Sequence, residues 1–403
     1  MLLGITGGAL LAIGVFNILA DPFRVFGTPR RTGINDRVPD TSGFDRMAKP
    51  YELLRIAPRT VLFGSSTAHA GFLDFGDWKT SLPKPAFNYA LLGASAHEIR
   101  LSLAQALRKC PVETVIIVAD FFAFNAHYLD NERFDAARLE AATHRGWPGF
   151  VGTDLAAFAV GREALGLSWE TITTSRRAVE KAGSEPQWWQ DYPWHVHFRN
   201  CERSYLAKWF PPPASKYEFA SAQTGNDRLA DFDASLHLCA ERAVRLIVLC
   251  PPIHARFQEA LSATGAWPHY ERWKRQLASH TLSQRAKRSG QGTVELWDFS
   301  IFNDLTCEPL PQDGMGRMHY FSDSAHFTPK FGQLILDEIL GSAPTRLGVR
   351  LDRVEIETHL AGIRAALEAF RMENPGVVTD VRAGLEIGRP SVAAPMASAM
   401  PGR

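Results

Sequence analysis

The chain has 403 residues, of which 45% are hydrophobic and 22% charged, and this composition excludes a wholly disordered protein. Lys and Arg number 44 against 43 Asp and Glu, so the chain has no basic excess of the kind typical of nucleic-acid-binding proteins. The five cysteines are scattered without a C-x-x-C pair, which argues against a zinc knuckle and against a disulfide scaffold. We therefore expect a globular protein of one or two domains that binds no nucleic acid.

The amino-terminal segment Leu2–Ala20 carries no charge. A helix needs roughly 20 apolar residues to cross a bilayer core, so this segment can just span one, and we interpret residues 1–20 as a single-pass transmembrane anchor. A cleaved signal peptide is an alternative, because Ile18-Leu-Ala20 resembles a cleavage site. A helix buried in the protein is another, although four glycines would weaken it in water. Arginines follow the segment and none precedes it, which favours a cytoplasmic body and leaves the orientation open.

Residues 21–59 are rich in Pro, Gly, Asp and Arg and are interpreted as a juxtamembrane connector. Five short apolar or β-branched runs follow, separated by helical stretches, and they predict strands at 60–63, 86–89, 114–119, 244–249 and 293–298. Apolar strands that alternate with helices indicate a parallel sheet covered on both faces. The sequence therefore predicts an α/β fold over residues 60–342, a three-layer α/β/α arrangement with a parallel five-stranded sheet.

Several helix boundaries are marked in the sequence. Ser95-Ala-His-Glu98 is a capping box that opens a helix running to about residue 109, and Thr328-Pro329 opens the last helix of the domain. Residues 126–234 separate the third and fourth strands, too many for a structureless loop, and predict a helical cap inserted there. One further helix is expected within residues 343–373, and a disordered tail over residues 374–403.

Two distant motifs carry groups suited to catalysis. The first predicted strand runs into Gly64-Ser65-Ser66, which places a hydroxyl at the carboxyl edge of the sheet, where α/β folds bind ligands. Asp323 precedes His326 by three residues, a spacing that lets the carboxylate hold one ring nitrogen while the other accepts a proton from a serine. Each motif alone also has a non-catalytic interpretation. The serine is then an ordinary helix N-cap, and the Asp/His pair is a chance occurrence in a loop.

A serine after the first strand and a D-x-x-H before the last helix form the layout of the SGNH (GDSL-like) hydrolases. Over roughly residues 45–342 the chain resembles that superfamily, and more closely the membrane-anchored SGNH-like proteins of bacterial exopolysaccharide and cell-envelope loci. The resemblance implies Ser66 as nucleophile, His326 as general base, Asp323 as its orienting acid and Gly93 as an oxyanion donor. It also implies esterase or O-acetyltransferase activity on an acylated sugar or polysaccharide, with no metal or cofactor, in a domain that faces the periplasm from the inner membrane.

One family motif is missing. The G-x-N-D block would supply an asparagine to the oxyanion hole, but the third strand here is followed by Asp120, with Asn125 as a later substitute. A carboxylate would repel an oxyanion, and the loss of one oxyanion donor typically costs on the order of 10²-fold in rate. An alternative is therefore a non-catalytic protein that keeps the fold and binds glycan or a partner.

Asp120 and four further residues are candidates for substrate contact. Cys250-Pro-Pro-Ile-His254 ends the fourth predicted strand, so His254 is expected to border the cleft. Trp188, Trp189 and Trp194 lie in the predicted insert and offer flat faces suited to sugar rings, although such rings often only pack a core.

Overall fold

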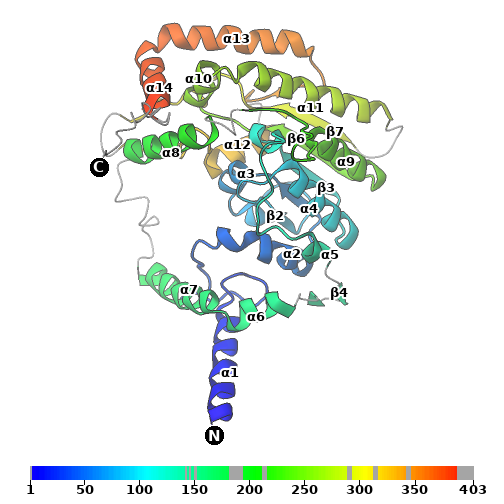
Figure 1. The fold of residues 1–403 in the computed structure, drawn as a ribbon, viewed down its shortest axis with the longest axis vertical. Coiled ribbons are helices and arrows are strands. Elements are labelled where there is room, and N and C mark those ends of the chain that lie inside the picture. The colour runs from blue at the N-terminus through cyan, green and yellow to red at the C-terminus, as the bar shows by residue number, and fades with distance from the viewer. Residues whose placement is uncertain are drawn as a thin grey trace, which may run out of the picture.

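The computed structural model describes residues 2–140, 143–144, 147–148, 152–180, 194–210, 216–287, 293–311, 316–341 and 346–387. A mostly parallel six-stranded sheet in the order β2-β1-β3-β6-β7-β8 forms its centre (Figure 1). Its strands are β1 (Thr60–Phe63), β2 (Ala86–Asn88), β3 (Thr114–Val118), β6 (Arg245–Cys250), β7 (Val294–Asp298) and β8 (Val349–Arg350). The predicted α/β fold is confirmed, but the count of five strands is wrong. The edge strand β8 pairs antiparallel with β7 over only two residues, too few for an apolar run to reveal it.

Side chains alternate between two cores along each central strand. In β1, Val61 and Phe63 join the core on one face of the sheet, and Leu62 joins the core on the other. This alternation follows from the two-residue period of a strand, and burial on both faces explains the continuous apolar runs. The first face is covered by α4 (Ala96–Lys109), α9 (Arg228–Glu241) and α11 (Trp267–Lys287), and the second by α3 (Ser66–Gly71) and α12 (Pro329–Ile339).

The two helix starts that the sequence marked with a cap are confirmed. The Ser95 hydroxyl oxygen accepts a hydrogen bond from the Glu98 amide, and the Glu98 carboxylate accepts one from the Ser95 amide, which is the predicted capping box at the start of α4. α12 begins at Pro329, whose fixed φ suits the first helical position. Helix α13 (Ile356–Glu373) also agrees with the prediction.

The expected disordered tail over residues 374–403 is wrong in its first part. Residues Pro375–Ile387 form α14, and residues 388–403 lie outside the described part of the chain. Val381 of α14 is buried with Leu206 of α8 (Trp194–Trp209) and Ala260 of α10 (Ala255–Ala263). A proline suited to the first helical turn and a buried apolar contact account for the order of this segment.

Between β3 and β6 the chain forms several short elements that the sequence predicted only as a helical insert. They are the 3-10 helix η3 (Phe121–Phe124), α5 (Ala136–Glu140), the hairpin strands β4 (Thr143–His144) and β5 (Trp147–Pro148), α6 (Gly152–Val160), α7 (Arg162–Glu180) and α8. Helix α9, which begins inside the predicted range 126–234, packs against α4 as part of the helix layer on the sheet. In the predicted connector, residues Ser42–Phe44 form η1 and Asp45–Ile56 form α2. The short η2 (Phe75–Asp77) follows α3.

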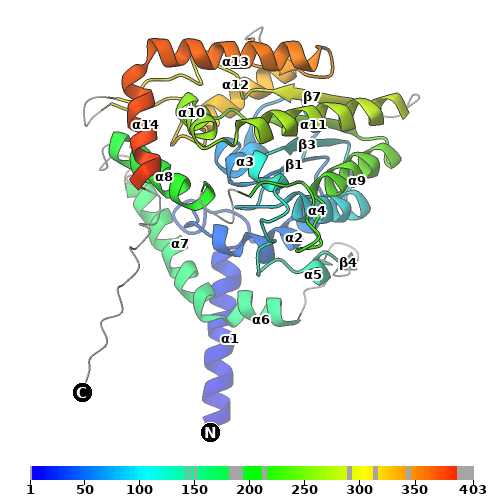
Figure 2. The ribbon, with the colours of Figure 1, turned by 45° about the horizontal axis from the view of Figure 1, so that its top comes forward.

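Helix α1 (Leu2–Ala20) projects from the body, with its carboxyl-terminal half held between α6 and α7 (Figures 1 and 2). Asn17 is buried and donates a hydrogen bond from Nδ2 to the carbonyl oxygen of Ala159, over 2.9 Å. Within the ranges described above, no helix is long and apolar enough to cross a membrane. The transmembrane helix expected over residues 1–20 is therefore not found there.

A buried ion pair joins strand β7 to helix α11. Lys274 of α11 places Nζ 2.7 Å from Oδ2 of Asp298 at the end of β7, and both side chains are fully buried. His359 of α13 approaches the same oxygen at 2.8 Å, so one carboxylate joins β7 to two helices. Breaking a buried pair leaves a charge without its partner in a medium of low dielectric constant.

Replacing Lys274 with methionine should therefore lower the free energy of unfolding by about 3–5 kcal/mol, measured by urea denaturation. Glu113→Gln is the matched control, because it removes the half-exposed pair between Arg59 and Glu113 and should cost less than about 1 kcal/mol. Equal losses in the two variants would contradict this account of the buried pair.

Candidate functional site

The candidate site lies where the sheet order changes direction. β2 pairs with one side of β1 and β3 with the other, so the connections that leave β1 and β3 at their carboxyl ends open a crevice. Ser65 and Ser66 follow β1, and Asp120 follows β3. A Cβ atom on Gly64 would lie 2.5 Å from Cβ of Ala68 and 3.0 Å from Cβ of Val118, so only glycine lets α3 start this close to the sheet.

A tight loop presents the distant acid and base. Phe321 and Phe327 form an antiparallel bridge and are both fully buried, which pinches the segment between them. Within it, one oxygen of Asp323 accepts hydrogen bonds from the amides of Ala325 and His326, over 2.8 and 2.9 Å. The direction of the His326 ring is therefore fixed by two buried phenylalanines and by the hydrogen bonds that Asp323 accepts from its own loop.

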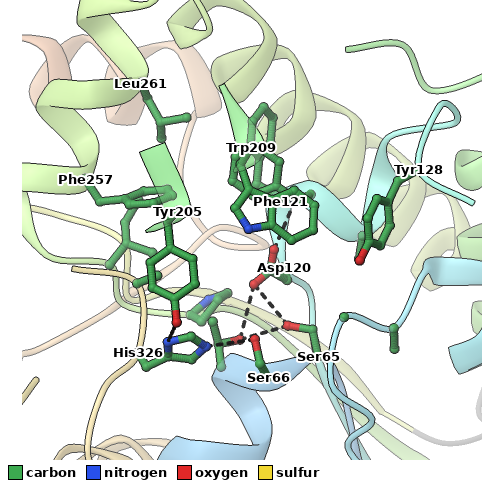
Figure 3. Close-up of a pocket in the computed structure, with 18 of the residues that line it drawn as sticks. Ser65, Ser66, Asp120, Phe121, Tyr128, Tyr205, Trp209, Phe257, Leu261 and His326 are labelled. Atoms are coloured by element: carbon green, nitrogen blue, oxygen red, sulfur yellow. Dashed lines mark hydrogen bonds between the residues drawn. The ribbon is translucent and has the colours of Figure 1, made fainter. Parts of the chain in front are cut away.

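The loop brings His326 to the amino-terminal end of α3 (Figure 3). Nε2 of His326 is 2.8 Å from Oγ of Ser66, although the two residues are 260 positions apart. On the other side of the ring, Nδ1 lies 2.9 Å from Oδ2 of Asp323. The three side chains expected to form a catalytic triad thus stand in the order serine, histidine, acid, with hydrogen-bonding distances between neighbours.

Asp323 and His326 each favour the charged form of the other. Burial alone would raise the pKa of Asp323, but His326 and the two loop amides outweigh it and hold that pKa below its ordinary value. Burial by itself would lower the pKa of His326, yet the neighbouring Asp323 carboxylate raises it overall. The acid stays ionised, and it stabilises the imidazolium that forms when the ring takes a proton.

Asp120, which is nearer than Asn125 to the position where the resemblance leads one to expect an asparagine, lines the pocket with Ser66. Its Oδ2 accepts hydrogen bonds from the hydroxyls of Ser65 and Thr67, over 3.1 and 3.3 Å, and its Oδ1 accepts one from the amide of Phe122, over 3.0 Å. Burial raises the pKa of Asp120, and these hydrogen bonds offset the shift only in part. Asp120 is therefore a carboxyl group for which ionisation is costly, next to Ser66.

Of the two other residues considered for the oxyanion hole, Gly93 lines the pocket and Asn125 does not. Gly93 lines the same pocket as Ser66 and adopts a left-handed φ of 62°, and a Cβ there would lie 2.8 Å from the hydroxyl oxygen of Tyr128. Asn125 is buried outside the pocket lining, where its Oδ1 accepts a hydrogen bond from the His127 amide over 3.1 Å. The structure thus places Asp120, rather than Asn125, beside the serine.

The expected substrate contacts are distributed differently from the prediction. His254 is buried at the start of α10, where Nε2 lies 2.7 Å from the carbonyl oxygen of Glu308, and it does not line the pocket. Trp194 is also buried, with its ring 6.2 Å from that of His197, and it lies outside the pocket lining. Trp188 and Trp189 fall outside the described residues.

Other aromatic residues, which the sequence did not single out, line the pocket instead. Tyr205 and Trp209 come from α8, in the insert, and the Tyr205 hydroxyl lies 3.0 Å from Nδ1 of His326. Phe121 and Phe122 follow Asp120 directly, so their adjacency to the end of β3 was a usable signal. Nothing in the sequence of α8 indicates that Tyr205 reaches His326, because the contact depends on how the insert folds back over the sheet.

No protein-family model matches the chain, and no curated protein matches it either. Function therefore has to be inferred from the geometry of the site.

Because the Asp120 carboxyl is buried, we expect Asp120→Asn to increase the free energy of unfolding in a pH-dependent way. A raised pKa means that Asp120 contributes stability at low pH, and this contribution is lost as the pH rises through the raised pKa. Asparagine does not ionise, so the free energy of unfolding of the variant should rise relative to that of the parent chain as the pH rises above the ordinary pKa of an aspartate, 3.8, measured by denaturant titration. Asp74→Asn, at an exposed turn, is the matched control for the substitution itself. A variant that loses stability with rising pH relative to the parent would contradict this account.

Proposed function

We propose that the protein is a serine acyl-ester hydrolase or O-acyltransferase of the SGNH type that works through Ser66, His326 and Asp323. The observation that supports this most is the 2.8 Å contact between Nε2 of His326 and Oγ of Ser66, with Asp323 held on the opposite ring nitrogen. A nucleophile, a base and an orienting acid in this order are what activates a serine hydroxyl near neutral pH.

The reaction follows from these positions. Oγ of Ser66 attacks the ester carbonyl carbon while His326 takes the hydroxyl proton at Nε2. The tetrahedral intermediate collapses, the ester C–O bond breaks, and His326 returns the proton to the departing alcohol. Water then attacks the acyl-serine in a hydrolase, whereas a sugar hydroxyl does so in a transferase. Both routes restore Ser66 and use the same three side chains.

The backbone amides of Ser66 and Gly93 are the proposed donors to the oxyanion. Gly93 suits this role because its left-handed φ and its missing side chain leave its backbone open to the pocket, next to Tyr128. Asp120 works against it when ionised, since a second negative charge near the oxyanion raises the barrier. In its neutral form Asp120 carries a proton that it can donate, and burial favours that form.

The finer parts of the proposal come from the family resemblance. It suggests an inner-membrane protein whose domain faces the periplasm, and an acylated sugar or polysaccharide as the alcohol component. A second candidate function is a non-catalytic protein that binds glycan or a partner. The carboxylate of Asp120 at the expected oxyanion-donor position favours it.

Labelling of the full-length protein with a fluorophosphonate tests the proposal. We expect covalent modification that peptide mapping by mass spectrometry assigns to Ser66, because only an activated serine attacks phosphorus at an appreciable rate. His326→Ala should lower the labelling rate by about 10³-fold or more, since it removes the base.

Ser65→Ala is the matched control, since Ser65 is the adjacent serine but its hydroxyl bonds Asp120 instead of His326. That variant should still be labelled at Ser66. A folded parent chain that takes no label, or that is labelled equally with and without His326, would favour the non-catalytic candidate.

A further inference from the structure

We propose that the pocket next to Ser66 holds the acyl part of the substrate as an extended apolar chain, longer than acetyl. This inference rests on the proposed acyl-ester chemistry and names its substrate class. The pocket lies directly beside Ser66 and His326, and its empty space, with the open solvent at its mouth counted in, is about 680 Å³.

The two ends of the pocket differ in chemistry (Figure 3). Ser66 and His326 lie at one end, while Phe257 and Leu261 of α10 lie toward the other, with Phe121 and Trp209 across from them. An ester carbonyl placed at Ser66 would direct its acyl chain between these apolar walls. The catalytic end is polar and the remainder is lined by rings and aliphatic side chains, which fits a chain with one reactive polar end.

Three hydroxyls of the pocket lining already have partners. The hydroxyls of Ser65 and Thr67 bond Asp120, and the Tyr205 hydroxyl bonds His326. A sugar ring in this space would bring several hydroxyls that need hydrogen bonds, and burying them without partners is costly. A hydrocarbon chain brings none.

The apolar walls are also firmly placed. Leu261 is fully buried and Phe257 is 5% exposed, both within the main core of the first sheet face. The ring centroid of Phe122 lies 4.9 Å from that of Trp209, and both residues line the pocket. Pre-formed walls of this kind select acyl groups by length, because each buried methylene adds favourable apolar contact.

The test compares p-nitrophenyl acetate, butyrate, hexanoate and octanoate as substrates of the full-length protein. We expect kcat/KM to rise by about fourfold per added methylene until the pocket is filled. Leu261→Trp fills the far end and should lower kcat/KM for octanoate more than for acetate. Trp209→Ala, at a half-buried position, should also reduce the preference for long chains. Leu282→Trp, at an exposed position of α11, is the matched control and should leave the series unchanged.

The outcomes separate this inference from the function on which it rests. Hydrolysis that depends on Ser66 but is fastest with acetate, and unaffected by both pocket variants, would overturn the acyl pocket and leave the serine chemistry standing. No Ser66-dependent hydrolysis and no fluorophosphonate label would overturn the proposed function itself.

A second, independent observation concerns the outer surface. Of the sixteen large apolar side chains that the structure shows exposed, nine lie on α1, α6 and α7, which pack together. We call these nine the apolar platform: Leu10, Leu11, Val15, Ile18, Leu19, Leu155, Val160, Leu165 and Trp169. We infer that the apolar platform rests on or in an anionic lipid membrane.

Helix α1 supports this inference by its two faces. Gly14 and Asn17 face α6, where a Cβ on Gly14 would lie 3.6 Å from Cγ1 of Val160, and Asn17 bonds the Ala159 carbonyl. Leu11, Val15 and Ile18 recur at helical spacing and are 70%, 49% and 39% exposed. Residues 6–12 are exposed and carry no charge, on the part of α1 that extends beyond the body (Figure 2).

Helix α7 carries the matching interfacial pattern. Leu165, Trp169 and Ile172 follow one another at helical spacing, and the exposed Arg162 and Arg176 lie on the same stripe. A tryptophan among aliphatic side chains, flanked by arginines, suits the boundary between acyl chains and anionic headgroups. The acidic Glu163 and Glu170 fall outside this stripe. The pattern favours lipid over a protein partner.

Flotation of the full-length protein with vesicles of phosphatidylcholine and phosphatidylglycerol tests the platform. We expect binding that falls at least tenfold in Leu11→Asp and several-fold in Trp169→Asp, while Leu282→Asp, also an exposed leucine, leaves it unchanged. Absence of flotation, or self-association lost in Leu11→Asp without vesicle binding, would overturn the lipid assignment. Loss in the α1 variant but not at Trp169 would overturn the role of α7.

Discussion

The candidate site depends on a constraint imposed by the parallel sheet, which delivers the carboxyl ends of β1 and β3 to one edge. Ser66 and Asp120 leave the sheet side by side for this reason, although 54 positions separate them in the chain. Gly64 lets α3 begin against Val118, which fixes the Ser66 hydroxyl close to the strand ends. The loop of Asp323 and His326 then needs to reach only this one edge, and its two buried phenylalanines hold it there.

Asp120 is the residue of the candidate site whose charge conflicts most with the chemistry proposed for Ser66. The same edge that carries Ser66 holds a carboxyl group that ionises at a cost, with Ser65, Thr67 and the Phe122 amide as its partners. Such a group either weakens an oxyanion hole or, when protonated, becomes part of one. Buried groups with displaced pKa values gather at functional sites, so Asp120 fits a site under functional constraint.

The insert gives the site its second wall. Helices α6 and α7 hold α1 and carry part of the apolar platform, while α8 returns to the sheet and brings Tyr205 and Trp209 over Ser66. One excursion between β3 and β6 therefore supplies both the cover of the pocket and an apolar outer surface. The proposed acyl pocket and the proposed lipid-facing surface suit each other chemically, because long acyl chains are concentrated in membranes.

The sequence by itself determined the parallel core, and the family resemblance pointed to the serine, histidine and acid that the structure brings together. These features are local: apolar runs give strands, a capping box gives α4, and the spacing of Asp323 and His326 fixes one hydrogen bond. Only the tertiary structure decided that Asp120 and not Asn125 stands beside Ser66, that Trp194 is buried, and that Tyr205 reaches His326. Those outcomes depend on packing between segments far apart in the chain. The order of α14 and the position of β8 also escaped prediction, because each depends on contacts with elements far away in the sequence and not on a strong local pattern.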